Sequence, residues 1–226
     1  MKSISVLSLT TLAAVVSLAS AAQAMDIHPN FKGGFYFGAA VGGSSLENRY
    51  KLLANGINHN FKDHNTRFSP GVMLGFSQRV GLFSAGIEVD GFLNNNKAKT
   101  SLSSGDISVT QKNNHDLRAA LKLGYNLTSS TSFYGSFGLN YRPSKLVIYT
   151  SGTSAKNINK SYKSTAFAPG IGLEVAFAPN LNLRAEYRTA FHKTRKFMSA
   201  DQTTTLKMKA RSERYLVGLT YQVVTR

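Results

Sequence analysis

The sequence predicts an all-β fold, a closed antiparallel barrel of eight strands that crosses a membrane as an up-and-down meander. Three observations carry this prediction: eight runs of about ten residues alternate between apolar and small or polar side chains, long and short connections alternate between the runs, and aromatic residues gather at the run ends. Beyond the N-terminal 24 residues no stretch is apolar and long enough for a spanning helix. Any insertion must therefore use strands, which can span a bilayer only as a closed barrel.

The runs follow one another in a regular order. Long polar stretches cover residues 44–67, 93–116, 142–164 and 193–214, and short turns separate the other neighbours. Short turns on one side and long loops on the other are typical of outer-membrane barrels. The eight predicted strands are Gly34–Gly43, Phe68–Ser77, Leu82–Phe92, Leu117–Leu127, Phe133–Tyr141, Thr165–Phe177, Leu181–Phe191 and Tyr215–Val223.

The clearest element is the hairpin from Thr165 to His192, which turns at Ala178-Pro179-Asn180. Every second residue of its strands, one parity, is aliphatic or aromatic, whereas the residues between them, the other parity, mix glycine and alanine with charged side chains. Side chains alternate between the two faces of a strand, so one face is apolar and the other is tight and ionic. A membrane barrel has this arrangement, because lipid takes the apolar face and the lumen takes the polar one. Two prolines, Pro70 and Pro169, count against an unbroken ladder, although both lie near the outer ends of their runs.

Aromatic residues support the same topology. They fall on the apolar parity at run ends, as expected for girdles at the two membrane interfaces. An ordinary strand preference for aromatic residues does not explain their clustering there. The expected inner girdle comprises Phe35, Phe76, Phe83, Tyr125, Phe133, Phe177 and Tyr221, and the outer one Tyr141, Phe167, Phe191 and Tyr215.

The N-terminus has the pattern of an export signal, with one basic residue, an apolar middle and the cleavage motif Ala22-Gln23-Ala24. We expect residues 1–24 to be a cleaved signal peptide and residues 25–226 to form the barrel domain; an uncleaved N-terminal helix is the alternative. The chain contains no cysteine, which excludes a disulfide framework and a lipoprotein anchor.

The inward parity carries four acids and four bases. An eight-stranded barrel is only wide enough to be filled by side chains, so buried charges must pair. We expect a structural ion-pair network; a gated ion path that opens when pairs exchange is the alternative. The residues are Glu88, Asp90, Arg118, Lys122, Glu174, Arg184, Glu186 and Arg188.

Three stretches resemble the eight-stranded outer-membrane barrel family of the OmpA membrane domain, OmpX and the neisserial opacity proteins. They are G-I-G-L-E-V-A-F-A-P-N-L-N-L-R-A-E-Y-R (170–188), A-G-I-E-V-D-G-F (85–92) and Y-L-V-G-L-T-Y-Q-V (215–223). The resemblance implies acid–base pairing across the lumen and places Glu88, Lys122, Glu174 and Arg184 at positions of that kind. These barrels commonly end in an aromatic residue, whereas this chain ends Val223-Val224-Thr225-Arg226.

The expected surface loops are strongly basic. The four long stretches carry net charges of +2, +1, +5 and +5, and such a patch attracts polyanions. We expect the partners to be outer-membrane lipids and lipopolysaccharide, or host glycans or proteins; an exported barrel without a recognition motif is a poor candidate for nucleic acid. The candidate binding residues are Arg142, Lys145, Lys156, Lys160, Lys163, Lys193, Arg195, Lys196, Lys207, Lys209 and Arg211.

No catalytic or metal constellation is visible in the sequence. The five histidines are scattered, and His192 at the rim has Lys193 and Thr194 beside it rather than a serine. We expect no enzyme activity, no metal and no cofactor. The leading hypothesis is a monomeric outer-membrane protein, structural or adhesin-like, with basic loops on the cell exterior. A narrow porin is the alternative, and a soluble ligand-binding barrel is a third possibility.

Overall fold

The computed structural model describes residues 33–54, 57–101, 107–150, 158–198 and 204–224. The expected signal peptide lies outside these residues. No helix in the described part of the chain is long and apolar enough to cross a membrane.

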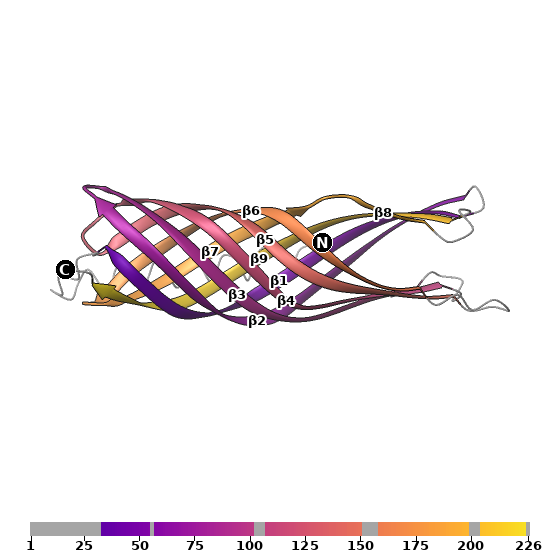
Figure 1. Ribbon diagram of the computed structural model, residues 1–226, viewed down its shortest axis with the longest axis horizontal. Coiled ribbons are helices and arrows are strands. Elements are labelled where there is room, and N and C mark those ends of the chain that lie inside the picture. The colour runs from indigo at the N-terminus through magenta and orange to yellow at the C-terminus, as the bar shows by residue number, and fades with distance from the viewer. Residues whose placement is uncertain (1–32, 55–56, 102–106, 151–157, 199–203, 225–226) are drawn as a thin grey trace.

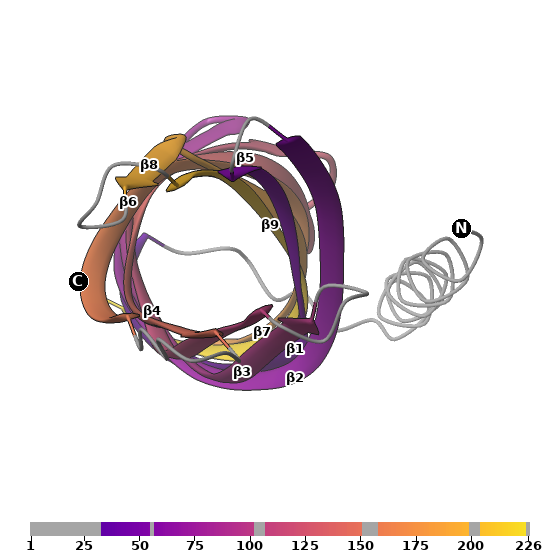
Figure 2. The same cartoon turned by 90° about the vertical axis from the view of Figure 1, so that its right-hand side faces the viewer.

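The described elements are all strands, and they close into a barrel (Figures 1 and 2). From β1 to β7 each strand pairs antiparallel with the next, both β7 and β8 pair with β9, and the ladder between β1 and β9 closes the ring. β7 and β8 pair with successive parts of β9, so together they form a single interrupted strand of the wall. The eight-stranded barrel prediction is therefore confirmed. The bounds are β1 Gly34–Ala54, β2 Ile57–Val80, β3 Phe83–Ser101, β4 Ile107–Asn126, β5 Thr131–Thr150, β6 Ile158–Ala178, β7 Leu181–His192, β8 Arg195–Met198 and β9 Thr204–Val224.

Side chains alternate between the two sides of the wall as the sequence pattern indicates. Ile87 and Leu121 are each 59% exposed on the outside, whereas Met73 and Glu88 are almost fully buried inside. Rings of the expected inner girdle lie on the outer face and pack in pairs, such as Phe83 against Tyr125 with centroids 5.5 Å apart. The barrel therefore has an apolar belt outside and a polar core inside, the reverse of a soluble sheet.

The strands are much longer than the predicted runs of about ten residues. Most have 19–24 residues, because the polar stretches expected to be loops continue the ladder. From Ser44↔Arg67 to Ala54↔Ile57, for example, β1 and β2 remain paired without a shift. The prediction of long loops is corrected here. Backbone pairing does not require apolar side chains, so a change of composition marks the end of the apolar belt and not the end of the strand.

Beyond the apolar belt the wall divides into two sheets, seen at one end of Figure 1. The first arm consists of the outer parts of β8, β9, β1 and β2, and the second arm of the outer parts of β3, β4, β5 and β6. Pairing between β2 and β3 stops at Gly71↔Phe92, and pairing between β6 and β7 stops at Ala166↔His192. These two seams separate the arms.

Side chains bridge the base of each seam. At the first, the Ser69 hydroxyl donates to the Leu93 carbonyl at 3.0 Å and lies 2.6 Å from Asn94 Oδ1. At the second, Ser164 Oγ lies 3.0 Å from His192 Nδ1. The seams also accommodate the two prolines. Pro70 precedes the first β2–β3 pair, and the β6–β7 ladder is interrupted between Phe167↔Phe191 and Gly170↔Arg188, next to Pro169. Each proline therefore lies beside a stretch where one of its two ladders is open.

Replacing Leu121 with arginine tests the outer apolar belt. Leu121 lies midway along the lipid-facing part of β4, so an arginine there should lower the free energy of unfolding by about 2–4 kcal/mol in a bilayer. Urea titration of the refolded barrel in lipid vesicles, followed by heat-modifiable gel mobility, measures the change. Leu121→Met is the control. An equal effect of the two substitutions would contradict a hydrocarbon-facing position.

Candidate functional site

The centre of the lumen is an ionic cluster around Arg184 on β7. Its guanidinium is fully buried and lies between two carboxylates, with Nη1 2.5 Å from Glu88 Oε2 and Nη2 bonded to Glu186. Arg184 Nε also donates to the Tyr134 hydroxyl at 3.1 Å, and that hydroxyl donates to Glu186 at 2.8 Å. These residues come from β3, β5 and β7, so the cluster ties distant strands together across the lumen.

A second arginine of β7 extends the cluster outward. Arg188 Nη1 lies 2.9 Å from both oxygens of Asp90, and its Nε lies 2.7 Å from Glu186 Oε1. Arg118 on β4 lies 3.4 Å from Asp90 and donates to the Ser136 hydroxyl at 2.8 Å. Side chains alternate between the two faces of β7, so Arg184, Glu186 and Arg188, each two residues from the next, lie on the same inner face.

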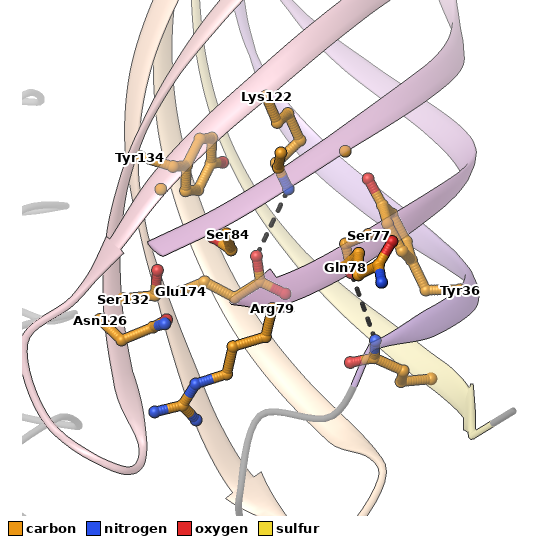
Figure 3. Close-up of a pocket in the computed structure, with 14 residues that line it drawn as sticks. Tyr36, Ser77, Gln78, Arg79, Ser84, Lys122, Asn126, Ser132, Tyr134 and Glu174 are labelled. Carbon is orange, nitrogen blue, oxygen red and sulfur yellow. Dashed lines mark hydrogen bonds and ion pairs between the residues drawn. The ribbon is translucent and has the colours of Figure 1, made fainter. Parts of the chain in front are cut away.

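At the short-turn end the cluster finishes in Lys122. Its Nζ lies 3.4 Å from Glu174 and 3.7 Å from Glu88, and it sits 4.2 Å above the centroid of the Tyr134 ring. Figure 3 shows the Lys122 amino group pointing toward Glu174 in a small cavity of about 40 Å³. That volume holds a few waters at most, because one water needs roughly 10–15 Å³ on this measure.

A further ionic group at the outer end was missed by the sequence reasoning. Asp116 accepts hydrogen bonds from Arg142 at 2.5 and 2.8 Å and from Arg214 at 2.7 Å, and Asn94 donates to it as well. Arg142 was expected on the surface, but it is 3% exposed and faces inward. The sequence did contain a signal for these positions, because the inward alternation of a strand continues past the end of a predicted run. Each of the three residues lies two positions beyond an inward residue: Asp116 beyond Arg118, Arg142 beyond Asn140 and Arg214 beyond Leu216.

This outer group lies beyond the apolar belt, outside the membrane-spanning segments. Burial alone would raise the pKa of Asp116, but the guanidinium groups of Arg142 and Arg214 outweigh burial and lower that pKa to about 2. The Asp116 carboxylate therefore stays ionised and holds the two arms together, since Asp116 and Arg142 belong to the second arm and Arg214 to the first.

All eight lumen residues named from the sequence lie inside the barrel. Seven are less than 9% exposed, and Glu174, at the short-turn end, is intermediate. The central residues lie between the 40 Å³ cavity and a second cavity of about 20 Å³ nearer the arms, which the outer group lines. The arrangement is a plug in which the four acids and four bases named from the sequence pair with one another.

The basic residues expected to form loops lie mainly on strands of the arms. Those with exposed side chains are Lys145, Lys163, Lys193, Lys207, Lys209 and Arg211. Lys160 lies on β6, and Arg195 and Lys196 form the start of β8. Lys156 lies outside the described residues. Arg211 is largely neutralised, because it pairs with Glu213 at 2.9 Å and lies opposite Glu47 in the register.

Register in the first arm brings cations of distant stretches into rows. Lys207 of β9 lies directly opposite Lys51 of β1 on one side and Lys196 of β8 on the other. Two residues along, Arg49 of β1 lies opposite both Lys209 of β9 and Lys62 of β2. We call these six residues the cationic ladder: Lys51, Lys196, Lys207, Arg49, Lys62 and Lys209.

The ladder positions share one parity of the register, and Lys51, Lys207 and Lys209 are exposed. Cross-strand partners share a face, and Lys207 and Lys209 have the parity of the outward Tyr215 and Val217 farther along β9. Neighbouring positions are about 5 Å apart across strands and about 7 Å apart along them. Like charges directly opposite one another destabilise a sheet. The sequence reasoning missed Arg49, Lys51 and Lys62, because only strand register places them beside the basic stretch of β9.

The second arm carries a shorter row of the same kind. Lys112 of β4 lies opposite Lys97 of β3 and Lys145 of β5. Lys112 and Lys145 are exposed. The basic charge is thus organised on both arms by strand pairing.

The rim histidine is hydrogen-bonded by serines that come from neighbouring strands rather than from its own sequence neighbours. His192 Nδ1 lies 3.0 Å from Ser164 Oγ, and Nε2 lies 3.3 Å from Ser212 Oγ. The serine that the sequence around His192 lacks is therefore supplied by β6 and β9. All three residues are buried, and two hydroxyl partners account for a buried imidazole at a seam. Among the described residues, no group of three or more histidine, aspartate or glutamate side chains is arranged to hold a metal ion.

A closed β-barrel with an apolar belt and an ionic core defines an integral membrane protein of the outer-membrane type. The chain belongs to the outer membrane protein beta-barrel domain family, whose model matches residues 10–222. This confirms the resemblance noted from the sequence and places the protein in the outer membrane.

Solved structures of similar fold cover most of the chain. They include the outer membrane protease OmpT from Escherichia coli (9% identity, 89% of this chain and 100% of that chain, TM-score 0.50) and OprG from Pseudomonas aeruginosa (13%, 88% and 100%, TM-score 0.48). Ail, the attachment invasion locus protein of Yersinia pestis, is another (15%, 85% and 100%, TM-score 0.42). At these identities the likeness concerns the fold alone. No curated protein matches the sequence.

Removing one partner of the central cluster should be costly. Arg184→Met leaves Glu88 and Glu186 buried without their shared cation, so we expect the free energy of unfolding to fall by about 3–5 kcal/mol. Urea titration of the refolded barrel measures this. Arg211→Met, at the half-exposed pair with Glu213, is the control and should cost less than about 1 kcal/mol. Equal costs would contradict a buried cluster that is required for stability.

The pH dependence of Asp116→Asn tests the outer ionic group. A carboxyl whose pKa is lowered on folding stabilises the protein above its unfolded pKa of about 3.9, and that contribution disappears as pH falls toward 2. We expect Asp116→Asn to cost about 2–3 kcal/mol at pH 6 and progressively less below pH 4. Unfolding midpoints of both proteins across this range measure the difference. A cost independent of pH would show that the charge of Asp116 is not the cause.

Proposed function

We propose that the protein is a non-enzymatic, monomeric outer-membrane barrel that binds polyanions at the cell exterior through its cationic ladder. The single observation that carries this proposal is the register, which aligns Lys51, Lys196 and Lys207 in one row and Arg49, Lys62 and Lys209 in the next. A sheet holding such rows is stabilised by a ligand that supplies counter-charges at similar spacing.

The orientation expected for such barrels supports an exterior site. Short turns of outer-membrane barrels face the periplasm, so the arms lie outside. The periplasmic end of this barrel has the tight connections Gly81–Leu82 and Pro179–Asn180 between paired strands. The basic rows are then at the level of, or beyond, the phosphate-bearing headgroups of the outer leaflet.

The ligand class follows from the ladder's form. Rows of cations about 5–7 Å apart suit a chain of repeated sulfate, phosphate or carboxylate groups better than a single compact anion. Two sources carry this chemistry: the protein's own lipopolysaccharide, and sulfated glycans of a host surface. Both are consistent with a structural or adhesin-like role, and neither requires a catalytic group.

The filled lumen supports a binding role over a channel. Paired charges occupy the space between the two small cavities, and moving any of them exposes a buried ion. We therefore expect the refolded protein to be silent in a planar bilayer at 100 mV. Stepwise conductance, abolished by Arg184→Met, would favour the narrow-porin alternative.

Binding of heparin, as a probe polyanion, tests the proposal. In the variant Lys51→Gln/Lys207→Gln two facing cations are lost, and at about 1 kcal/mol for each cation the affinity in physiological salt should fall roughly 30-fold. The salt dependence of binding should become shallower as well. Surface plasmon resonance with the refolded barrel in lipid nanodiscs measures both quantities.

The matched control is Arg67→Gln/Arg79→Gln, which removes the same charge at positions outside the ladder and the candidate binding residues and should reduce affinity much less. Equal losses in the two variants would show that net charge, rather than the ladder, attracts heparin. The same variants titrated with vesicles containing lipopolysaccharide distinguish the two ligand sources.

A further inference from the structure

A second, separate site is indicated inside the outer mouth of the barrel. A cavity of about 20 Å³ lies there between the central cluster and the arms, and its lining includes Arg118, Arg142, Arg188, Arg214, Asp116, Glu213 and Asn140. The Glu213 carboxylate is already paired with the exposed Arg211. Four guanidinium groups thus share a space large enough for one water-sized species.

Three buried polar atoms of this lining lack a hydrogen-bond partner within the described chain. They are Arg118 Nε, Arg214 Nε and Asn140 Oδ1. Arg118 is 3% exposed and Arg214 is 8% exposed, so water outside the protein does not satisfy their donors. A buried donor on a charged group without an acceptor is unfavourable, which points to a ligand that accepts from both arginines. The Asn140 oxygen needs a donor instead, and rotation of its amide group turns N–H toward such a ligand.

Charge in the described lumen is not balanced. Six bases, Arg118, Lys122, Arg142, Arg184, Arg188 and Arg214, face five acids, Glu88, Asp90, Asp116, Glu174 and Glu186. One positive charge is therefore in excess in a space where an uncompensated ion is costly.

The excess is located at the outer cavity. Both oxygens of Asp116 are already bonded to Arg142, Arg214 and Asn94, so Asp116 has little capacity left for Arg118. Burial lowers the pKa of Arg214, and although Asp116 opposes this, repulsion from Arg188 and Arg142 helps bring that pKa to about 10. Two neighbouring guanidinium groups thus act on Arg214 besides its carboxylate partner.

We propose that this cavity binds one monovalent anion of halide size between the guanidinium groups of Arg118 and Arg214. Such an anion accepts from both unpartnered Nε donors and neutralises the excess charge. Room for about one water-sized species suits a halide ion better than a sulfate or phosphate group. This inference goes beyond the polyanion-binding function, because the cavity lies inside the barrel, whereas Lys51, Lys207 and Lys209 of the ladder are exposed on the first arm.

Bromide as the probe ion tests the proposal. Crystals of the refolded barrel grown with bromide should show an anomalous peak between Arg118 and Arg214. The unfolding midpoint should rise saturably when bromide replaces isethionate at constant ionic strength and pH. Density without an anomalous signal in this cavity, or bromide bound only elsewhere, would overturn the proposal.

Two variants and a control sharpen the test. Arg214→Gln removes the excess charge and one donor, and should lose both the peak and the bromide-dependent shift. Asn140→Asp places a carboxylate beside the cavity without changing the side-chain shape, so it should fold well and also lose both signals. Arg211→Gln removes an exposed arginine nearby and should keep both. Bromide retained at full occupancy in Asn140→Asp would contradict the inferred charge balance.

Discussion

Closure of the backbone ladder between β1 and β9 is the constraint on which the other features depend. In hydrocarbon each unpaired N–H or C=O group costs several kcal/mol, so a sheet in a membrane must have no edge. Closing the sheet with eight strands fixes a narrow lumen and leaves the apolar face to the lipid. Ion pairing inside then becomes obligatory, because the strands that cross the membrane also carry charged residues on their inner parity.

The ionic cluster and the inner glycines fit together as one packing solution. Tyr36 donates to Glu88 at 2.7 Å, and a Cβ at Gly75 would collide with the Tyr36 ring. Likewise a Cβ at Gly172 would come within 2.5 Å of Tyr134 Cζ, the ring that lies under Lys122. Glycines on one strand thus leave space for the tyrosine rings of a neighbouring strand, and these rings contact the buried charged side chains. Outside the membrane the backbone is free of this constraint, and the wall divides into arms at two seams where serine, asparagine and histidine side chains replace ladder bonds.

Much of the barrel could be predicted from the sequence, since alternation directly encodes which face a side chain takes. The inner positions of Glu88, Arg184 and Glu186 follow from parity alone. Strand ends could not be predicted in the same way, because the composition changes at the membrane surface whereas the pairing continues to Ala54 and Thr204. Arg142 was misplaced for this reason. The cationic ladder could not be predicted for a different reason. Lys51 and Lys207 are far apart in the chain, and their pairing depends on the register between the first and last strands, which close the barrel.

Amide hydrogen exchange in the first arm tests this structure most directly. β1 is paired on both sides from Ser44 to Ala54, so each of its N–H groups there has a partner on β2 or β9. Exchange measured by NMR on the refolded barrel in micelles should show protection continuing through Glu47, Arg49 and Lys51, well beyond the apolar belt. Exchange at the rate of an unstructured peptide from Ser44 onward would show that these residues form a loop, and the cationic ladder would then have no structural basis.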